Sequence, residues 1–287
     1  MRLTTDYGTQ MRRKILITGA TGFVGRQIIN LLQNSEVDLH IIVRKSSKEK
    51  IPTEHKFASV IYTNDLFSEN SDWWLDKCRE IDTVVHAAWY AEPGSYLNSD
   101  RNITCLIGSL SLAHGAIKAG VRRFVGIGSC LEYDPTDGYL SVDTPLKPYS
   151  LYASAKSSLY ITLTGWFKEV GVEFCWCRLF YLFGEGDSPK RLWGYISKNL
   201  ENKKPVDLTE GSQIRDYIDV GEAANLIVEK IFSNYVGAAN ICSGVPITVR
   251  ELATGLAERL GSEHLLNFGV KAERPDEPRC IVGIKSR

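Results

Sequence analysis

Three polar side chains in the middle of the chain have the types and spacing for proton transfer: Ser129, Tyr152 and Lys156. Tyr152 and Lys156 are four residues apart in a segment with a helical pattern, so both side chains share one face. An ammonium beside a phenol favours the phenolate and lowers the phenol pKa, which suits Tyr152 to general acid–base catalysis near neutral pH. The same Tyr-x-x-x-Lys spacing also occurs in surface pairs. Ser129, at the end of an earlier predicted strand, favours the catalytic interpretation.

A glycine-rich turn near the start of the chain has the pattern of a phosphate-binding site. It follows the apolar run Ile15–Thr18 and precedes an amphipathic segment, so a strand, a turn and a helix are predicted in succession. Gly19 permits the tight turn, Gly22 lets backbone N–H groups approach a pyrophosphate, and Gly25 lets the helix pack closely on the strand. An ordinary strand-to-helix turn is the alternative. The setting and the lack of a Walker lysine favour a dinucleotide.

The residue that ends the second predicted strand indicates which dinucleotide is bound. That strand covers residues 38–43 and is followed by Arg44. A carboxylate at this place binds the adenosine ribose hydroxyls, whereas an arginine accommodates a 2′-phosphate. The pattern therefore favours NADP(H), with NAD(H) as the alternative. Lys48 and Lys50 continue the positive charge, so a solvated basic loop is also open.

The ends of later strands complete the predicted cofactor site. Asp65 follows a predicted strand over residues 57–63, and its carboxylate either accepts a hydrogen bond from the adenine amino group or caps a turn. Ala87 and Ala88 end a buried strand and leave room for a ligand at the carboxyl edge of the sheet. The full set of expected cofactor contacts is Gly19, Thr21, Gly22, Phe23, Val24, Gly25, Arg44, Asp65, Leu66, Ala87, Ala88, Tyr152, Lys156 and Phe180.

Predicted strands and helices alternate from Lys14 onward, which is typical of an α/β fold with a parallel, doubly wound sheet. Helices are expected over residues 69–78 and 102–119, and a further helix is expected to open with residues 148–156. A mixed α and β region follows the strand over residues 172–180. We expect a dinucleotide-binding domain over residues 11–177. Residues 178–287 are expected to form a smaller region that mainly binds substrate, with some strands returning to the first sheet.

The second region carries side chains that suit a second anionic ligand with a flat base. These are Arg191, Arg215 and Arg274, together with Trp193 and Tyr195. Because the chain as a whole carries no net charge, ordinary surface arginines are the alternative. We expect the two regions to pack against each other with the substrate between them.

The composition is ordinary for a globular protein, with 44% hydrophobic and 24% charged residues among 287. The formal net charge of +0 argues against nucleic acid as a partner. No apolar run reaches membrane-spanning length and the polar leader has no signal-peptide core, so neither a membrane nor secretion is indicated and a cytoplasmic location is expected. Residues 1–10 look like an extension ahead of Met11. The seven cysteines are odd in number, so we expect reduced, buried thiols and no metal site.

Taken in order, these stretches resemble the extended short-chain dehydrogenase/reductase family, in its nucleotide-sugar epimerase/dehydratase branch, over Lys14–Pro275. Each landmark alone is weak, but their common order is specific. The matching stretches are Thr18–Gly25, Val85–Ala88, Phe124–Ser129, Tyr152 with Lys156, Arg178–Gly184, Gln213–Val220, Asn240–Gly244 and Arg274–Pro275.

The resemblance implies a Rossmann sheet that binds a nicotinamide dinucleotide and a second region that binds a nucleoside-diphosphate sugar. By the same likeness, Tyr152 exchanges a proton with a sugar hydroxyl or keto oxygen and Ser129 hydrogen-bonds that oxygen. Lys156 holds the nicotinamide ribose and tunes Tyr152. The helices around Asn102 and Tyr152 form a dimer interface in relatives, which implies a homodimer. The expected substrate contacts are Trp89, Tyr181, Arg191, Arg215 and Arg274.

The chain departs from the family pattern on the sugar side of the site. Tyr181 stands where the family has an asparagine, Phe183 where it has a tyrosine, and Glu185 where it has a proline. Cys105 replaces a further asparagine. The sequence also stops soon after Pro275, so we expect either a trimmed substrate region or an early end. These differences predict a remodelled sugar site beside an ordinary cofactor site.

Residues after Ser129 indicate the type of reaction. Family 4,6-dehydratases carry an Asp-Glu pair there, but this chain has Cys130 and Leu131. Glu132 is one residue late and is expected to point away from the sugar, because side chains on an extended segment alternate faces. Arg44 suits NADPH and net reduction, so we expect reduction at C4 of a nucleoside-diphosphate 4-keto-6-deoxyhexose. A 4-epimerase with tightly bound NAD is the alternative. A non-catalytic dinucleotide sensor is a third hypothesis, against which the complete catalytic set argues.

Overall fold

The structure is a computed structural model that describes residues 12–275 and 277–286. The expectation for residues 1–10 lies outside the described residues. Within the described part, none of the helices combines the length and apolarity that a membrane span requires.

The centre of the molecule is a seven-stranded sheet with the order β11-β7-β5-β4-β1-β2-β3, in which every pairing is parallel. All residues of β4 and β5 are buried, as expected for strands that are covered on both faces. The strands are β1 Arg13–Thr18, β2 Val37–Arg44, β3 Ser59–Thr63, β4 Thr83–His86, β5 Arg123–Ser129, β7 Glu173–Leu179 and β11 Gly237–Ile241.

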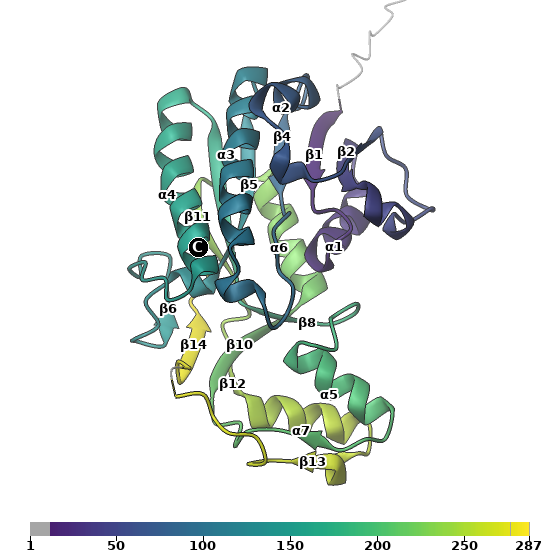
Figure 1. Ribbon diagram of the computed structural model, residues 1–287, viewed down its shortest axis with the longest axis vertical. Coiled ribbons are helices and arrows are strands. Elements are labelled where there is room, and N and C mark those ends of the chain that lie inside the picture. Colours follow the sequence, from purple (N-terminus) through teal and green to yellow (C-terminus); the bar gives the residue numbers. More distant parts are fainter. Residues whose placement is uncertain (1–11, 276, 287) are drawn as a thin grey trace, which may run out of the picture.

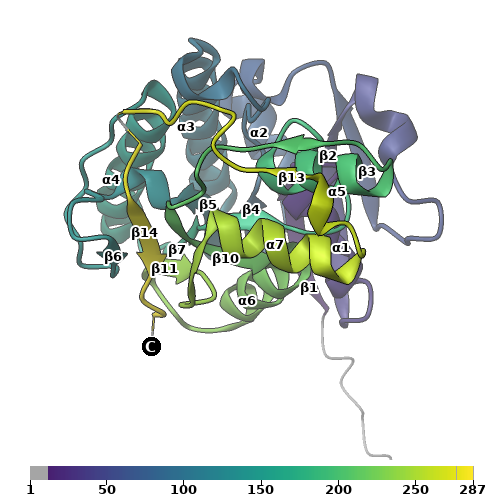
Figure 2. The same ribbon diagram turned by 90° about the horizontal axis from the view of Figure 1, so that it is seen from below.

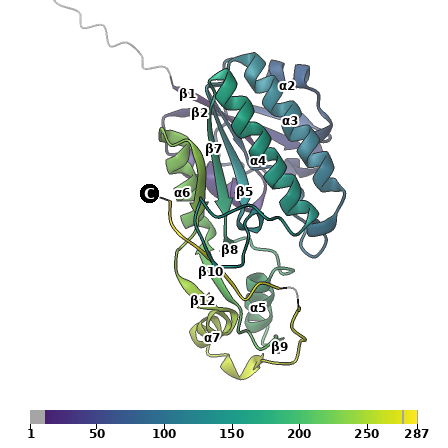
Figure 3. The ribbon, with the colours of Figure 1, turned by 90° about the vertical axis from the view of Figure 1, so that its left-hand side faces the viewer.

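Helices cover both faces of this sheet (Figures 1 and 3). Helices α1 and α6 pack on one face and share an aliphatic core with the strands, whereas α2, α3 and α4 pack on the other face around a more aromatic core. The predicted doubly wound α/β fold is therefore confirmed. The bounds are α1 Phe23–Leu32, α2 Ser71–Lys77, α3 Arg101–Ala119, α4 Leu151–Val170 and α6 Val220–Phe232.

A smaller mixed region lies beyond the carboxyl edge of the large sheet (Figures 1 and 2). A second sheet has the order β12-β10-β14-β6 with β8 paired to β10, and β13 pairs with β9. Helices α5 and α7 pack on a separate apolar cluster. The bounds are β6 Tyr139–Leu140, β8 Tyr181–Phe183, β9 Val206–Asp207, β10 Ile214–Asp219, β12 Pro246–Thr248, β13 Leu266–Asn267, β14 Cys280–Gly283, α5 Leu192–Glu201 and α7 Val249–Arg259.

The chain crosses between the two regions several times. Strand β11 and helix α6 come from the second half of the sequence but belong to the large sheet, whereas β6 comes from the first half and pairs with β14. Five short 3₁₀ turns lie after strands or in other connections of the described chain. They are η1 Lys45–Lys50, η2 Leu66–Ser68, η3 Tyr96–Asn98, η4 Cys130–Glu132 and η5 Glu263–Leu265.

Candidate active site

The glycine-rich turn brings backbone N–H groups to the carboxyl edge of the sheet. Gly19 has φ +76°, and a Cβ there would lie 2.6 Å from the Ala88 nitrogen, so glycine is needed for this close approach to β4. A Cβ on Gly25 would collide with the Gly19 carbonyl oxygen. Helix α1 starts after Gly22, with no side-chain cap and no acidic residue in its first turn. Its first N–H groups are open to an anion, so the turn fits a dinucleotide pyrophosphate.

A buried histidine supports this turn. His86 Nδ1 lies 2.8 Å from Thr18 Oγ1, and His86 Nε2 lies 2.8 Å from Ser109 Oγ. Ser109 Oγ donates to the Cys105 carbonyl oxygen (2.6 Å). Ser109 therefore accepts from Nε2–H, and the Thr18 hydroxyl donates to Nδ1. Burial lowers the His86 pKa to about 3, so a neutral imidazole links β1, β4 and α3.

The structure brings the three catalytic candidates together. Ser129 is the last residue of β5, and Tyr152 lies in the first turn of α4, just after its Ser150 cap. The Ser129 hydroxyl is near enough to Tyr152 to lower the pKa of its phenol. Lys156 is buried one turn further along α4, and its Nζ donates to the Ile127 carbonyl oxygen (2.6 Å). All three side chains thus meet where β5 ends.

Aromatic rings frame the catalytic tyrosine. The Tyr96 ring packs edge-on against Tyr152 with centroids 4.9 Å apart, and the Trp89 ring does so at 6.4 Å. Lys156 Nζ lies 3.8 Å from the Trp89 ring centroid, and Trp89 Nε1 donates to Asn102 Oδ1 (2.9 Å). Trp89, an expected substrate contact, therefore packs on both catalytic side chains of α4. Tyr96 was not predicted, because it reaches the site from the η3 turn.

The expected effect of Lys156 on the Tyr152 phenol was wrong for this structure. Burial raises the Tyr152 pKa, the neighbouring Tyr96 raises it further, and the Ser129 hydroxyl lowers it by less. Burial also lowers the Lys156 pKa to about 7. The helical spacing does place the two residues on one face, but the ammonium is held by the Ile127 carbonyl and the Trp89 ring. Tyr152 is therefore a protonated phenol at neutral pH.

The remaining predicted cofactor residues lie after strand ends or around the start of α1. Arg44 is exposed at the end of β2, the strand next to β1. Asp65 accepts a hydrogen bond from the Phe67 N–H (3.1 Å) and caps η2, which is the turn-capping alternative, while its adenine contact stays a prediction. Leu66 is buried beside it, and Phe180 is buried directly after β7. Thr21, Phe23 and Val24 lie in the glycine-rich turn and the first turn of α1.

Arg191 connects the second region to the glycine-rich turn. Its guanidinium carbon lies 5.5 Å from the Phe23 ring centroid, and its Nε lies 3.8 Å from Asp187 Oδ1. Nearby, the Arg26 guanidinium packs against the Gly186 backbone, where a Cβ would collide with it. The loop that precedes α5 therefore lies against the start of α1, which places a cation beside the predicted pyrophosphate site.

Arg215 is buried in a second cationic centre, on β10. Its Nη2 donates to Glu277 Oε1 (2.7 Å), and its guanidinium carbon lies 5.5 Å from the Tyr181 ring centroid. The Tyr181 ring in turn packs on Tyr217 at 5.7 Å. Arg274 is exposed, and its carbonyl oxygen accepts from the Glu277 N–H (3.1 Å). Arg215, Tyr181 and Arg274 thus belong to one neighbourhood, connected through Glu277.

Two aromatic residues that suit a flat ligand make internal contacts instead. Trp193 packs on Phe183 with ring centroids 4.5 Å apart. Tyr195 Oη accepts a hydrogen bond from the Asp207 N–H (3.2 Å). Both residues lie on α5, and these contacts attach that helix to β8 and β9.

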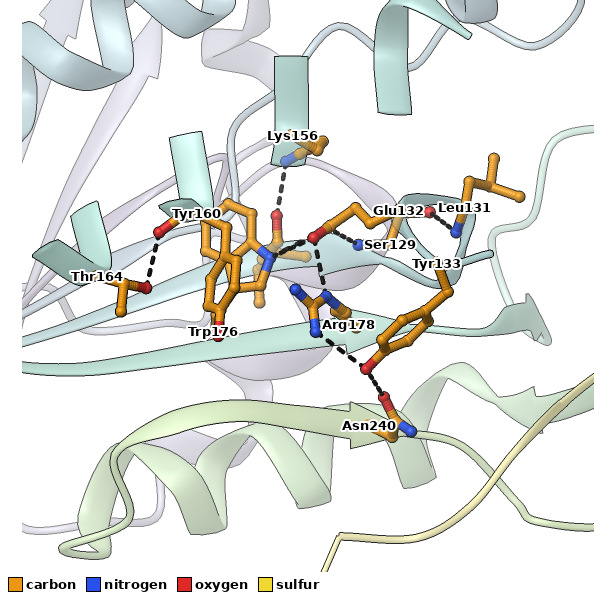
Figure 4. Close-up of polar contacts among 11 residues, drawn as sticks. Ser129, Leu131, Glu132, Tyr133, Lys156, Tyr160, Thr164, Trp176, Arg178 and Asn240 are labelled. Carbon is orange, nitrogen blue, oxygen red and sulfur yellow. Dashed lines mark hydrogen bonds and ion pairs between the residues drawn. The ribbon is translucent and has the colours of Figure 1, made fainter. Parts of the chain in front are cut away.

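A buried polar cluster that was not predicted lies directly behind Ser129 (Figure 4). Glu132 points toward Arg178, and its expected direction away from the sugar stays a prediction. Residues Cys130–Glu132 form the η4 turn rather than an extended segment. The Ser-x-x-Glu spacing is a capping-box signature, and it is the signal that could have predicted this turn.

The cysteines match the expected reduced and buried thiols. All seven are free, and only Cys280 is partly exposed. Cys175 Sγ and Cys177 Sγ lie 3.9 Å apart in the core. Within residues 12–275 and 277–286, no group of three or more His, Cys, Asp or Glu side chains could hold a metal ion.

Comparison with known proteins agrees with this geometry. Residues 15–237 match the NAD dependent epimerase/dehydratase family. The chain belongs to this family. The resemblance that the sequence motifs indicated is thereby confirmed, and the chain is an enzyme of the extended short-chain dehydrogenase/reductase type. The hypothesis of a non-catalytic sensor is not retained.

Three proteins illustrate the family relationship. The chain is 24% identical over 281 residues to dTDP-6-deoxy-L-talose 4-dehydrogenase (NAD(+)) of Aggregatibacter actinomycetemcomitans, covering 94% of this chain and 99% of the relative. The UDP-glucose 4-epimerase of Thermus thermophilus in complex with NAD has a TM-score of 0.81 at 21% identity, covering 95% and 90% of the two chains. The dTDP-glucose 4,6-dehydratase DesIV of Streptomyces venezuelae with NAD bound has a TM-score of 0.79 at 19% identity, covering 95% and 88%. These two structures share the fold of this chain.

Proposed function

We propose that this family member uses NAD(P)H to reduce C4 of a nucleoside-diphosphate 4-keto-6-deoxy sugar. The observation that carries the proposal is the grouping of Ser129, Tyr152 and Lys156 at the end of β5, beside the edge of the sheet where the α1 turn is open. Reduction of a ketone needs a proton donor, whereas oxidation of a hydroxyl needs a base. The relative named dTDP-6-deoxy-L-talose 4-dehydrogenase supports the position and the sugar class.

The three side chains have separate roles in this reaction. A bound nicotinamide supplies the hydride. Ser129 Oγ donates a hydrogen bond to the keto oxygen, and Tyr152 Oη gives its proton to the alkoxide that develops there. Lys156, one helical turn further along α4, holds the nicotinamide ribose through its Nζ. Solvent then returns a proton to the phenolate.

The cationic residues divide the binding of two anionic ligands. Arg191 lies over Phe23 at the start of α1, so it is placed to contact phosphates at the junction of cofactor and substrate. Arg215 and Arg274 are placed to contact the phosphates or ribose of the nucleotide sugar. Tyr181 and Trp89 offer flat faces to the base or the sugar.

The identity of the dinucleotide rests on Arg44. An exposed arginine at the end of β2 suits a 2′-phosphate, so we propose a preference for NADP(H). The 24% identical relative is named as an NAD(+) enzyme and both neighbour structures hold NAD, which supports NAD(H) as the alternative.

A 4-epimerase with tightly bound NAD is the alternative reaction, and the likeness to the Thermus thermophilus enzyme supports it. Dehydration has less support, because the first two positions after Ser129 are Cys130 and Leu131. Burial raises the Cys130 pKa, so this thiol is a poor replacement for a catalytic carboxyl group. Neither residue supplies the acid and base that removal of water needs.

A substrate panel tests the proposal. Purified enzyme would be mixed with NADPH or NADH and with dTDP- and UDP-linked 4-keto-6-deoxyhexoses, and absorbance of the reduced nicotinamide would be followed. We expect NADPH or NADH to be consumed with at least one keto sugar. If the sugar matches that of the relative, we also expect oxidation of dTDP-6-deoxy-L-talose in the reverse direction. No consumption with any keto sugar would contradict reduction.

We also propose a homodimer, formed by α3 and α4. Their outer faces carry exposed apolar side chains, namely Ile103, Ile107 and Ile161. Apolar side chains on adjacent helices are suited to self-association across a two-fold axis. Light scattering on the purified chain would test this state.

A further inference from the structure

A carboxylate lies buried directly behind the catalytic serine. Glu132 is fully inaccessible to solvent, and its Oε1 accepts hydrogen bonds from the Ser129 N–H (2.7 Å) and the Trp176 Nε1–H (3.0 Å). Its Oε2 accepts from Arg178 Nε (2.8 Å). The carboxylate therefore connects the residue that ends β5 to two residues of the neighbouring strand β7 (Figure 4).

Arg178 anchors this carboxylate to the rest of the fold. Its guanidinium is stacked between two rings, with its carbon 4.5 Å from the Tyr133 centroid and 4.4 Å from the Tyr160 centroid. Arg178 Nη1 donates to Tyr133 Oη (3.0 Å), and Tyr133 Oη donates to Asn240 Oδ1 (2.7 Å). The cluster thus includes residues of β7, β11 and α4, and these three elements set the position of Glu132 in addition to its own turn.

The sequence of β5 makes room for the cluster. A Cβ on Gly128 would lie 2.6 Å from Glu132 Oε1 and would collide with Trp176 Nε1, and a Cβ on Gly126 would collide with the Trp176 ring. Both glycines are needed for close packing of β5 against the indole and the carboxylate. Any side chain at Gly128 would displace the group that holds Ser129.

We propose that Glu132 is the positioning residue of the catalytic serine. Glu132 holds the Ser129 N–H from behind, while Ser129 Oγ accepts from the Leu131 N–H (3.2 Å). The Leu131 N–H occupies one lone pair of the Ser129 oxygen. The hydroxyl proton of Ser129 is therefore free to point toward Tyr152 or a substrate oxygen. The effect of Glu132 on turnover rests on the proposed function, since its hydrogen bond to the catalytic set is made to the Ser129 N–H.

The charge of Glu132 also reaches Lys156. Lys156 Nζ donates to the carbonyl oxygen of Ile127, two residues before Ser129. Burial lowers the Lys156 pKa, and the Glu132 carboxylate opposes this by favouring the ammonium. One buried carboxylate therefore supports both the serine and the lysine.

Two double variants separate positioning from general destabilisation. Removing Glu132 alone would leave the Arg178 cation buried without a partner, so Arg178 is replaced in both variants. Glu132→Gln/Arg178→Met keeps an amide oxygen that can accept from the Ser129 N–H. Glu132→Leu/Arg178→Met has no acceptor. Both are uncharged at this site, and both should unfold cooperatively in a thermal scan.

The kinetic comparison is between these two variants. We expect kcat on the best keto sugar of the panel to fall by about 10- to 100-fold in the leucine double variant relative to the glutamine double variant, with KM changed by less than about threefold. Neither double variant carries the charge that reaches Lys156, so the difference between them acts through Ser129 and should vanish in a Ser129→Ala background. Equal kcat in the two variants, or a difference that persists in Ser129→Ala, would overturn the proposal.

A readout without substrate keeps the inference separate from the proposed function. Hydrogen exchange of the Ser129 N–H should be slow in the wild-type chain and the glutamine double variant, and at least tenfold faster in the leucine double variant. Equal exchange in both variants would overturn the positioning role even if the enzyme reduces a keto sugar. If exchange differs but no keto sugar is reduced, the proposed function fails and the Glu132 contact stands. Glu173→Gln is the matched control. It loosens the Arg123–Glu173 ion pair (2.7 Å) at the other end of the same two strands, and it should change neither kcat nor the exchange of the Ser129 N–H.

Discussion

At the scale of single residues, removing the Tyr152 hydroxyl separates proton donation from cofactor binding. Tyr152→Phe keeps the ring that packs on Tyr96 but has no proton to give. We expect kcat to fall by about 10²- to 10⁴-fold while the Kd for NAD(P)H changes little, as measured by steady-state kinetics and fluorescence titration. Tyr139→Phe, at an exposed position on β6, is the control. Near-normal turnover in Tyr152→Phe would remove the residue from the mechanism.

The charge at Arg44 decides the preference between the two dinucleotides. Arg44→Asp replaces a partner for the 2′-phosphate with an acceptor for ribose hydroxyls. The ratio of kcat/KM for NADPH to that for NADH should fall at least tenfold. Lys48→Asp, in the neighbouring η1 turn, makes the same change in net charge and should shift the ratio much less. An unchanged ratio in Arg44→Asp would mean that Arg44 faces solvent.

Residues of the site were predictable where the chemistry is local in sequence. Tyr152 and Lys156 are one helical turn apart, so their shared face follows from helix geometry alone. The partnership of Glu132 with Arg178 depends instead on the register of β5 against β7, which pairs Gly128 with Arg178. The raised Tyr152 pKa likewise depends on burial in the folded chain and then on Tyr96, which reaches the site from a separate turn.

At the scale of elements, the approach of α1 to the sheet depends on one glycine. Gly25→Ala puts a Cβ against the Gly19 carbonyl oxygen, so we expect loss of at least tenfold in dinucleotide affinity together with a lower Tm. Gly255→Ala, also inside a helix, meets no atom within 4 Å and should stabilise the chain by about 0.5–1 kcal/mol. Isothermal titration and thermal scans measure both effects. Wild-type affinity in Gly25→Ala would show that the close approach is not required.

His86 should make stability depend on pH. Its folded-state pKa is lowered to about 3, so the folded chain keeps it neutral while the unfolded chain binds a proton below pH 6.5. The free energy of unfolding should therefore decrease as pH falls from 6.5 toward 3, by up to about 5 kcal/mol from this group. His86→Gln should flatten that dependence in urea titrations between pH 4.5 and 7. An identical slope in the variant would contradict this origin.

Most elements of the large sheet were predictable because each strand and helix has a clear local pattern. The helix expected over residues 102–119 is observed as Arg101–Ala119, and its C-cap is Gly120 with φ +80°. The strand expected over residues 57–63 begins only at Ser59. The η4 turn was not predicted, because it depends on the Ser129 side chain, which accepts a hydrogen bond from the Leu131 N–H directly after the strand.

At the scale of the whole molecule, the second region approaches the cofactor turn through the loop before α5. Lys190 in that loop forms an ion pair with Glu92 (2.7 Å), and Arg191 lies over Phe23. The expectation that the second region packs on the first is consistent with these contacts. The pairing of β6 with β14 could not be predicted, because β6 has only two residues and its partner is far away in sequence.

The central claim, net reduction at C4, is tested most directly with cofactor that carries deuterium on the transferred position. The enzyme would be incubated with deuterated NAD(P)H and the keto sugar nucleotide that the panel identifies, and the product analysed by mass spectrometry and NMR. Reduction predicts that cofactor consumed equals deoxyhexose formed and that each product molecule carries deuterium at C4. Interconversion of UDP-glucose and UDP-galactose with no net change in cofactor and no deuterium in the product would contradict the account and establish the epimerase.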